Sequence, residues 1–241
     1  MGRSQLIATQ ALTSALIADM ASRAISKCPN PIREILLSSK NEQTFSGLLA
    51  SELASNPTLA LGNSTTNPSG FVLLEFKGKD YVRKTEDGKK KSRNFHDLSI
   101  VDEDGEINLI IENKFWYHFD GCKGKGNPKP EKGIKEQLEG DIFKIKRTLG
   151  EENSGKKGFI LINVVTPGNP NLIPPSYLSE HKKVWDRTRG DIATYRREGL
   201  DGVLSVVKKY SKDLRSISIE GLGESSDGGF IDFICAEVAL N

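Results

Sequence analysis

The chain has few of the residues from which disulfide frameworks and histidine metal sites are built. Its 241 residues include three cysteines, Cys28, Cys122 and Cys235, which are widely spaced and odd in number. This pattern fits neither a disulfide framework nor a zinc motif, so we expect reduced thiols and a cytoplasmic protein. The three histidines form no pair at metal-ligand spacing, which leaves little for a histidine-based metal site.

Long apolar runs are also missing. No stretch reaches the length of a transmembrane helix, so we expect no membrane association. Residues 6–24 have a helical pattern, but Asp19 interrupts it and no clean cleavage site follows, so we do not interpret it as a signal peptide. The glycines at 121, 124 and 126 are not followed by Gly-Lys-Ser/Thr, which argues against a nucleotide-binding P-loop.

Positive charge is concentrated in a few segments. The formal net charge is only +2, but residues 77–93 hold eight basic and three acidic residues, and residues 123–147 hold eight and four. Residues 213–241 hold one basic and six acidic residues. This segregation favours a polyanionic partner such as nucleic acid, although a lysine-rich solvated loop explains residues 87–92 equally well. The candidate contacts are Lys89, Lys90, Lys91, Arg93, Lys123, Lys125, Arg187 and Arg189.

Hydrophobic periodicity predicts helices alternating with strands. Helices are expected at 4–27, 41–54, 134–149 and 179–210, the last with a break near Gly199, and a loop at 117–133. Strands are expected at 71–76, 79–83, 95–101, 107–115, 158–165 and 230–238. This order predicts an α/β fold with a central mixed β-sheet flanked by helices. We expect one globular unit, with a helical segment at 1–40 and the main domain and its C-terminal elaboration at 41–241.

The most informative stretch, residues 94–115, predicts a β-hairpin. Asp104-Gly105 suits a tight type I′ turn between two apolar-rich runs. A two-residue loop there sets Asp97 directly opposite Glu112, with Lys114 on the same face as Glu112, whereas a longer loop with a bulge would shift this register. Two carboxylates with Cβ atoms roughly 5 Å apart repel one another unless a cation lies between them. A divalent metal ion is the natural candidate.

An Asp followed by Glu-x-Lys on the next strand suits phosphodiester hydrolysis. Asp97 and Glu112 carry the hard oxygen ligands that Mg²⁺ prefers, and Mn²⁺ is expected to substitute. The metal would activate a bound water and neutralise charge on the scissile phosphate. The Lys114 ammonium would orient that water or stabilise the transition state, and removing a proton itself would require a strongly lowered pKa.

The segment His96-Asp97 followed by Ile110-Ile111-Glu112-Asn113-Lys114 resembles the PD-(D/E)XK nuclease superfamily, the fold of many type II restriction endonucleases and several repair nucleases. His96 stands where the family name has proline. Residues 41–53 resemble the first core helix of the family, whose acidic residue often joins the metal site. We favour Glu42 over Glu52 for that acid, although a carboxylate complementing the helix dipole is an equal alternative. Gln137 resembles a glutamine that some branches place beside the catalytic lysine, and an exposed helix residue is the alternative there.

The resemblance covers residues 41–165 and implies a restriction-endonuclease-like core with Mg²⁺-dependent DNA endonuclease activity, most simply that of a type II restriction enzyme. It implies metal binding by Asp97, Glu112 and the carbonyl of Asn113, with Lys114 acting on the water. Glu42 would complete the acidic cluster and Gln137 would assist Lys114. Double-stranded DNA is the expected partner, and cleavage of a palindrome implies a homodimer. Two alternatives stay open: a repair or recombination nuclease of the same fold, and an inactive nucleic-acid-binding module.

Overall fold

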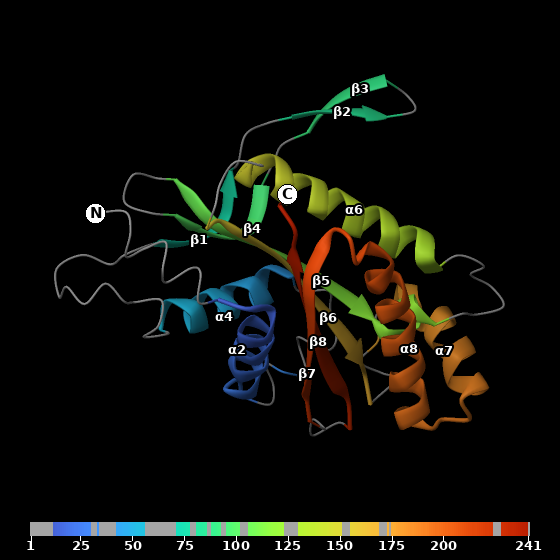
Figure 1. The fold of residues 1–241 in the computed structure, drawn as a ribbon. Coiled ribbons are helices and arrows are strands. Elements are labelled where there is room, and N and C mark those ends of the chain that lie inside the picture. Colours follow the sequence, from blue (N-terminus) through green and yellow to red (C-terminus); the bar gives the residue numbers. More distant parts are fainter. Residues whose placement is uncertain are drawn as a thin grey trace.

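The structure is a computed structural model, and it describes residues 12–29, 33, 42–55, 71–77, 81–85, 88–92, 95–101, 106–122, 130–150, 155–168, 173, 175–223 and 228–240. A six-stranded sheet runs through the molecule, and helices cover both of its faces (Figure 1). The predicted α/β class with a central mixed sheet flanked by helices is therefore confirmed.

The sheet has the strand order β1-β4-β5-β6-β8-β7. Its strands are β1 (Phe71–Lys77), β4 (Phe95–Val101), β5 (Ile107–Tyr117), β6 (Lys157–Thr166), β7 (Leu214–Leu222) and β8 (Phe230–Val238). Strands β5 and β6 are parallel and the other neighbours in this sheet are antiparallel. A parallel pair needs a long crossover, and a helix between the two strands supplies it. Strands β2 (Tyr81–Thr85) and β3 (Gly88–Ser92) form a separate two-stranded sheet.

The helices are α2 (Ser14–Ser26), α4 (Glu42–Ala54), α5 (His118–Gly121), α6 (Pro130–Leu149), α7 (Leu178–Arg187) and α8 (Ile192–Val207), with 3₁₀ turns at Pro175–Tyr177 and Lys208–Tyr210. Helices α2 and α4 lie on one face of the sheet, and α6 and α8 lie on the other (Figure 1). The Thr13 hydroxyl begins α2 by accepting a hydrogen bond from the Leu16 N–H at 3.2 Å. Helix α2 packs in the same core as the sheet, so the described part of the N-terminal segment belongs to the main unit.

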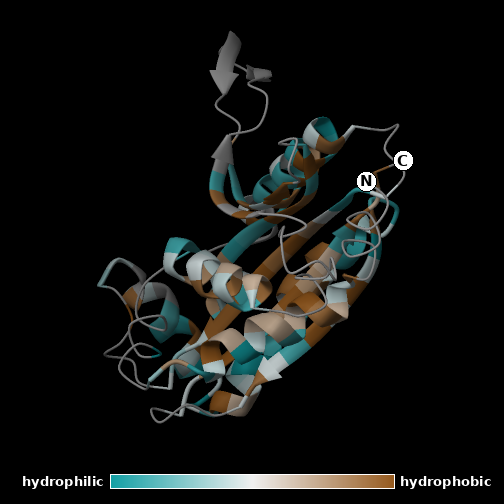
Figure 2. Cartoon of the chain, turned by 90° about the vertical axis from the view of Figure 1, so that its left-hand side faces the viewer, coloured by the Kyte–Doolittle hydropathy of each residue, from teal (hydrophilic) through white to brown (hydrophobic). Residues whose placement is uncertain are grey.

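The sheet separates two hydrophobic cores. Successive side chains of a strand point to opposite faces, so on β5 Leu109 and Ile111 enter the first core with α2 and α4, while Ile110 and Trp116 enter the second core with α6 and α8. Figure 2 shows hydrophobic residues along the central strands and hydrophilic residues on the outer faces of the helices. Strand β6 is buried on both faces, as its continuous apolar run predicts.

Strands β4 and β5 pair in the expected register between Leu98 and Ile100. Leu98 lies opposite Ile111, which is the register that a two-residue loop predicts. A bulge between Ile100 and Val101 then shifts the pairing, so Val101 lies opposite Ile107 rather than Asn108. The pairing of the two strands ends at Leu98 and Ile111. Beyond it, the β4 side chain in contact with Glu112 is that of His96, and Asp97 accepts a hydrogen bond from the Asn113 N–H. The predicted turn at 104–105 lies outside the described residues.

Three details of the predicted elements are wrong. The break in the helical region 179–210 lies at residues 188–191 rather than at Gly199, because Arg189 and Gly190 have positive φ angles of 55° and 74°. Gly199 is helical, and a Cβ there would lie 2.5 Å from the Cβ of His118. The expected loop at 117–133 contains helix α5 and the start of α6. The periodicity also missed strands β3 and β7.

All three cysteines are free and buried. Burial raises the pKa of the Cys122 thiol to about 12. None of the helices in the described part of the chain has the length and apolar character to cross a bilayer.

Candidate functional site

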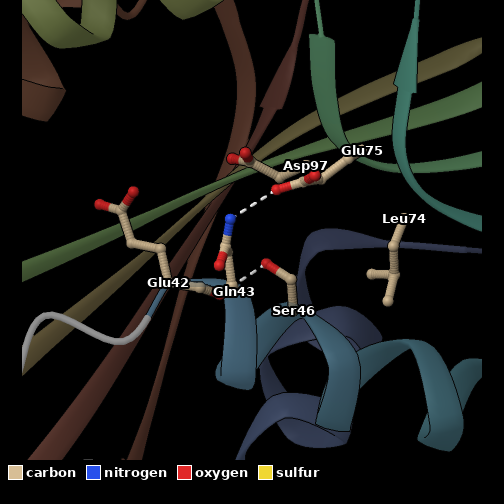
Figure 3. A pocket seen from close by; sticks show the side chains of 6 residues that line it. All are labelled: Glu42, Gln43, Ser46, Leu74, Glu75 and Asp97. Carbon is tan, nitrogen blue, oxygen red and sulfur yellow. Dashed lines mark hydrogen bonds between the residues drawn. The ribbon is translucent and has the colours of Figure 1, made fainter.

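A pocket lies beside the end of the hairpin. Its volume is about 410 Å³. Three of its lining residues, Glu42, Gln43 and Ser46, lie on helix α4. Leu74 and Glu75 on strand β1 and Asp97 on strand β4 complete the lining. Figure 3 shows the carboxylates of Glu42 and Asp97 at the end of the pocket away from Leu74, with Gln43 reaching to Glu75. The pocket is therefore acidic and includes two of the predicted site residues.

Asp97 is a carboxylate in an unfavourable environment. Its Oδ2 accepts a hydrogen bond from the backbone N–H of Asn113 at 2.7 Å, and the nearest ammonium, Lys114 Nζ, lies 3.9 Å away. Burial and the neighbouring charge of Glu112 raise the pKa of Asp97 to about 6, and Lys114 offsets this only in part. The repulsion expected between the two strand carboxylates is thus present.

Glu112 is fully buried, and both of its oxygens are engaged. Oε1 lies 2.6 Å from Nδ1 of His96, and Oε2 accepts from Nζ of Lys144 at 2.9 Å. Burial by itself raises the pKa of Glu112, but the hydrogen bond from His96 and the charge of Lys144 outweigh it and leave the pKa below its usual value. Glu112 is therefore an ionised carboxylate held by two donors.

Lys114 lies between carboxylates from the sheet and from helix α6. Its Nζ is 3.2 Å from Oδ2 of Asp141, closer than the 3.9 Å that separates it from Asp97. Burial lowers the pKa of Lys114, but Asp141, Asp97 and the other carboxylates raise it above its usual value. Lys114 is consequently protonated at neutral pH and acts as a cation and hydrogen-bond donor.

Helix α6 presents a polar stripe to the hairpin, of which the sequence analysis named only Gln137 and missed the other three residues. Gln137, Asp141, Lys144 and Thr148 recur at helical spacing between the apolar positions of this helix. Asp141 bridges the two lysines, since Nζ of Lys144 lies 3.3 Å from its Oδ1. Thr148 Oγ1 lies 2.8 Å from Nε2 of His96. Polar residues at this spacing between the apolar positions of an amphipathic helix were the available signal.

Gln137 is exposed, as the alternative interpretation expected, and it contacts a different residue from the one that the resemblance implies. Its Oε1 accepts a hydrogen bond from the indole N–H of Trp116 at 3.0 Å. The residue of α6 that pairs with Lys114 is Asp141, one turn further along the helix.

Glu42 and Asn113 join helix α4 to the hairpin. Oε1 of Glu42 accepts from the Phe115 N–H at 3.2 Å, and Nδ2 of Asn113 donates to Ser46 Oγ at 3.1 Å. Glu52, the other candidate acid of this helix, instead pairs with Lys27 and Arg23 on α2. Of the two acids, Glu42 is the one at the pocket.

The candidate nucleic-acid contacts are only partly described. Arg187 forms an ion pair with Glu198, and Arg189 is exposed in the turn between α7 and α8. Strand β3 contains Lys89, Lys90 and Lys91, but the structure does not describe their side chains. Arg93, Lys123 and Lys125 lie outside the described residues.

The donor chemistry of the site fits Mg²⁺ at Asp97, whose raised pKa marks an excess of negative charge that a cation would relieve. Glu112 does not present a free oxygen, because His96 and Lys144 hold both. Among the described residues, no three His, Cys, Asp or Glu side chains converge as a metal-binding group. An ion bound by Asp97 and Glu112 would therefore compete with the Lys144 ammonium for Oε2 of Glu112.

Comparison of the chain with protein-family models, with curated proteins and with solved structures gives no match.

Proposed function

We propose that the protein is a Mg²⁺-dependent DNA endonuclease with a restriction-endonuclease-like core, most simply a type II site-specific enzyme. The observation that carries the proposal is the environment of Asp97. This carboxylate lines an open acidic pocket, and burial together with Glu112 raises its pKa to about 6. A repulsive carboxylate pair beside a lysine weakens a fold, but it suits a cation site at which phosphate chemistry occurs.

The metal would be held by Asp97 and Glu112, with the Asn113 carbonyl expected as a further ligand and Mn²⁺ as a substitute. When bound, Mg²⁺ supplies a water of lowered pKa and neutralises charge on the scissile phosphate. Glu42 adds negative charge at the same end of the pocket.

Lys114 is the residue that would contact the reacting groups. Its pKa is raised above the usual value, so at neutral pH it donates hydrogen bonds and does not remove a proton. An ammonium in this position would orient the attacking water or stabilise charge on the phosphate in the transition state. Asp141 holds that ammonium through the 3.2 Å contact.

DNA cleavage tests the proposal directly. Purified protein is incubated with supercoiled plasmid and phage DNA in Mg²⁺, in Ca²⁺ and in EDTA. Asp97→Ala and Lys114→Ala are expected to abolish cleavage, whereas Glu139→Ala and Lys146→Ala, on helix α6 outside the site, are expected to retain it. Discrete fragments formed only with Mg²⁺ support a site-specific endonuclease.

The same experiment separates the alternatives. Nicking, or cleavage confined to branched or damaged DNA, favours a repair or recombination nuclease of the same fold. DNA binding without cleavage of any substrate favours an inactive binding module and contradicts the catalytic roles. Cleavage of both strands of a palindrome would further predict a homodimer, since a twofold site is matched by a twofold protein. Sedimentation of the protein with a cleavable duplex in Ca²⁺ measures that state.

A further inference from the structure

Lys144 occupies an oxygen that the proposed metal site needs. Glu112 is fully buried, and its Oε2 lies 2.9 Å from Nζ of Lys144. The other oxygen of Glu112 lies 2.6 Å from the His96 ring. In this arrangement the positive charge next to Glu112 comes from helix α6 of the chain itself.

The charges of the site are unevenly balanced. Four carboxylates, on Glu42, Asp97, Glu112 and Asp141, surround the two ammonium groups of Lys114 and Lys144. Both ammonium groups lie close to Asp141 or Glu112, whereas the contact of Asp97 with Lys114 is longer, at 3.9 Å. The least compensated negative charge is thus that of Asp97, which lines the pocket.

Lys144 already has a second carboxylate partner. Its Nζ lies 3.3 Å from Oδ1 of Asp141, one turn away on the same helix, and its side chain is 21% exposed. A lysine side chain is long and rotatable. It can therefore leave Glu112 and remain paired with Asp141.

We propose that Lys144 is an internal counterion that holds Glu112 in the metal-free protein, and that a divalent ion bound by Asp97 and Glu112 displaces Lys144 from Glu112 and leaves it paired with Asp141 alone. The inference rests on the proposed function for the identity of the metal site and adds a residue that competes with the metal. Lys144 stabilises the fold without metal and lowers the affinity for it. Asp141 is the positioning residue that retains it.

Calcium binding tests the inference without any need for cleavage. Calorimetry with Ca²⁺ and thermal unfolding with and without Ca²⁺ are measured for the wild type and for Lys144→Met. The dissociation constant of Lys144→Met is expected to fall about ten-fold, because Glu112 has lost a competing cation. The melting temperature of Lys144→Met without metal is expected to be lower than that of the wild type. The rise in melting temperature on adding Ca²⁺ is expected to be larger for Lys144→Met than for the wild type.

The matched control is Lys146→Met. Lys146 lies on the same helix and pairs with Asp213 at 2.7 Å, in a contact remote from Glu112. This variant is expected to keep the wild-type Ca²⁺ affinity. Lys144→Gln serves as a second variant if Lys144→Met does not fold, since glutamine still donates a hydrogen bond without carrying charge.

The outcomes separate the inference from the proposed function. If the wild type binds Ca²⁺ through Asp97, as loss of binding in Asp97→Asn would establish, unchanged or weaker affinity in both Lys144 variants overturns the inference alone. Binding by the Lys144 variants but not by the wild type supports it. If neither wild type nor variants bind Ca²⁺, Mg²⁺ or Mn²⁺, the inference and the metal-dependent function both fail.

Discussion

Lys114 on strand β5 and Asp141 on helix α6 form a largely buried ion pair, with Nζ 3.2 Å from Oδ2. The pair connects the strand that would carry the reacting ammonium to the helix behind it. Removing one partner of a buried pair leaves an uncompensated charge. Asp141 therefore determines where Lys114 points and also how well α6 is held.

Asp141→Asn is expected to lower kcat for DNA cleavage by about 10- to 100-fold with little change in KM, because Lys114 loses its orientation. Asp141→Glu, which keeps the charge, is expected to recover part of the loss. Glu139→Gln, on the exposed side of the same helix, is the control. Equal losses in Asp141→Glu and Asp141→Asn, or a change confined to KM, would contradict this positioning role.

Asp97→Asn is expected to stabilise the metal-free protein at pH 8. Because the pKa of Asp97 is raised to about 6 in the folded state from an ordinary value of 3.8, its contribution to stability is fully present below pH 3.8 and is lost as the pH rises through 6. Asparagine removes the repelled charge and still accepts from the Asn113 N–H. The side chain is 31% exposed, so the expected gain in unfolding free energy is about 1–2 kcal/mol rather than the full value of the shift.

Urea unfolding in EDTA at pH 8 and pH 4.5 measures this effect. The advantage of Asp97→Asn should shrink at the lower pH, where the carboxyl of the wild type is protonated. Asp213→Asn, which removes the partner of Lys146, is the control and should not stabilise the protein at either pH. A loss of stability in Asp97→Asn at pH 8 would refute the assignment of Asp97 as a repelled carboxylate.

The cluster of His118, His181 and Tyr195 is expected to make the protein sensitive to acid. Burial lowers the pKa of His181 from 6.5 to about 4 and holds that of His118 well below its usual value. Because the unfolded chain binds these protons first, stability is full above pH 6.5 and is lost as the pH falls toward 4. Titration of one such histidine changes the unfolding free energy by at most about 1.4 kcal/mol per pH unit.

The variant His181→Asn isolates this contribution, because asparagine retains a polar group near the Tyr195 hydroxyl and does not titrate. The slope of unfolding free energy against pH between 7.5 and 4.5 should be shallower in His181→Asn than in the wild type. Parallel slopes would show that His181 takes up no extra proton on unfolding.

Two helical glycines should respond in opposite directions to alanine. A Cβ at Gly202 on α8 would lie 1.8 Å from the carbonyl oxygen of Gly121 on α5, whereas at Gly140 on α6 it would meet nothing within 4 Å. Gly202→Ala is expected to lower the unfolding free energy by about 2 kcal/mol or more, since overpacking forces the backbone to shift. Gly140→Ala is expected to raise it by about 0.5–1 kcal/mol through helix propensity. Thermal unfolding of both variants at one pH compares them, and equal signs would contradict the close contact of α5 with α8.

The sequence predicted the hairpin well because its signals are local. The apolar runs predicted the pairing of Leu98 with Ile111, whereas the turn dipeptide lies outside the described residues. Asp97 and Lys114, both named from the sequence, lie 3.9 Å apart. Asp141 and Lys144 lie more than twenty residues further along the chain. Their contacts depend on the rotation of α6 over the sheet, which hairpin spacing does not determine.

Strand β7 was missed for a different physical reason. It is an edge strand, and its face toward α2 carries serines in place of apolar residues. The Ser14 hydroxyl lies 2.9 Å from each of the hydroxyls of Ser216 and Ser218. Residues 216–219, Ser-Ile-Ser-Ile, do alternate with period two, so a short strand signal was present. It is weak because its two apolar residues are not in the core: Ile217 is partly buried and Ile219 is exposed. The helix break was misassigned because a glycine that permits close helix packing and a glycine that ends a helix look alike in a sequence.

The separation of the two cores by the sheet gives each its own fluorophore. The chain has two tryptophans: Trp116 lies within the second core, and Trp185 packs against the first. Emission from single-tryptophan proteins, made with Trp116→Phe or Trp185→Phe, would therefore report solvent entry into one layer at a time. Coincident red shifts during denaturation would mean that the two layers melt together, and separate shifts would order their loss.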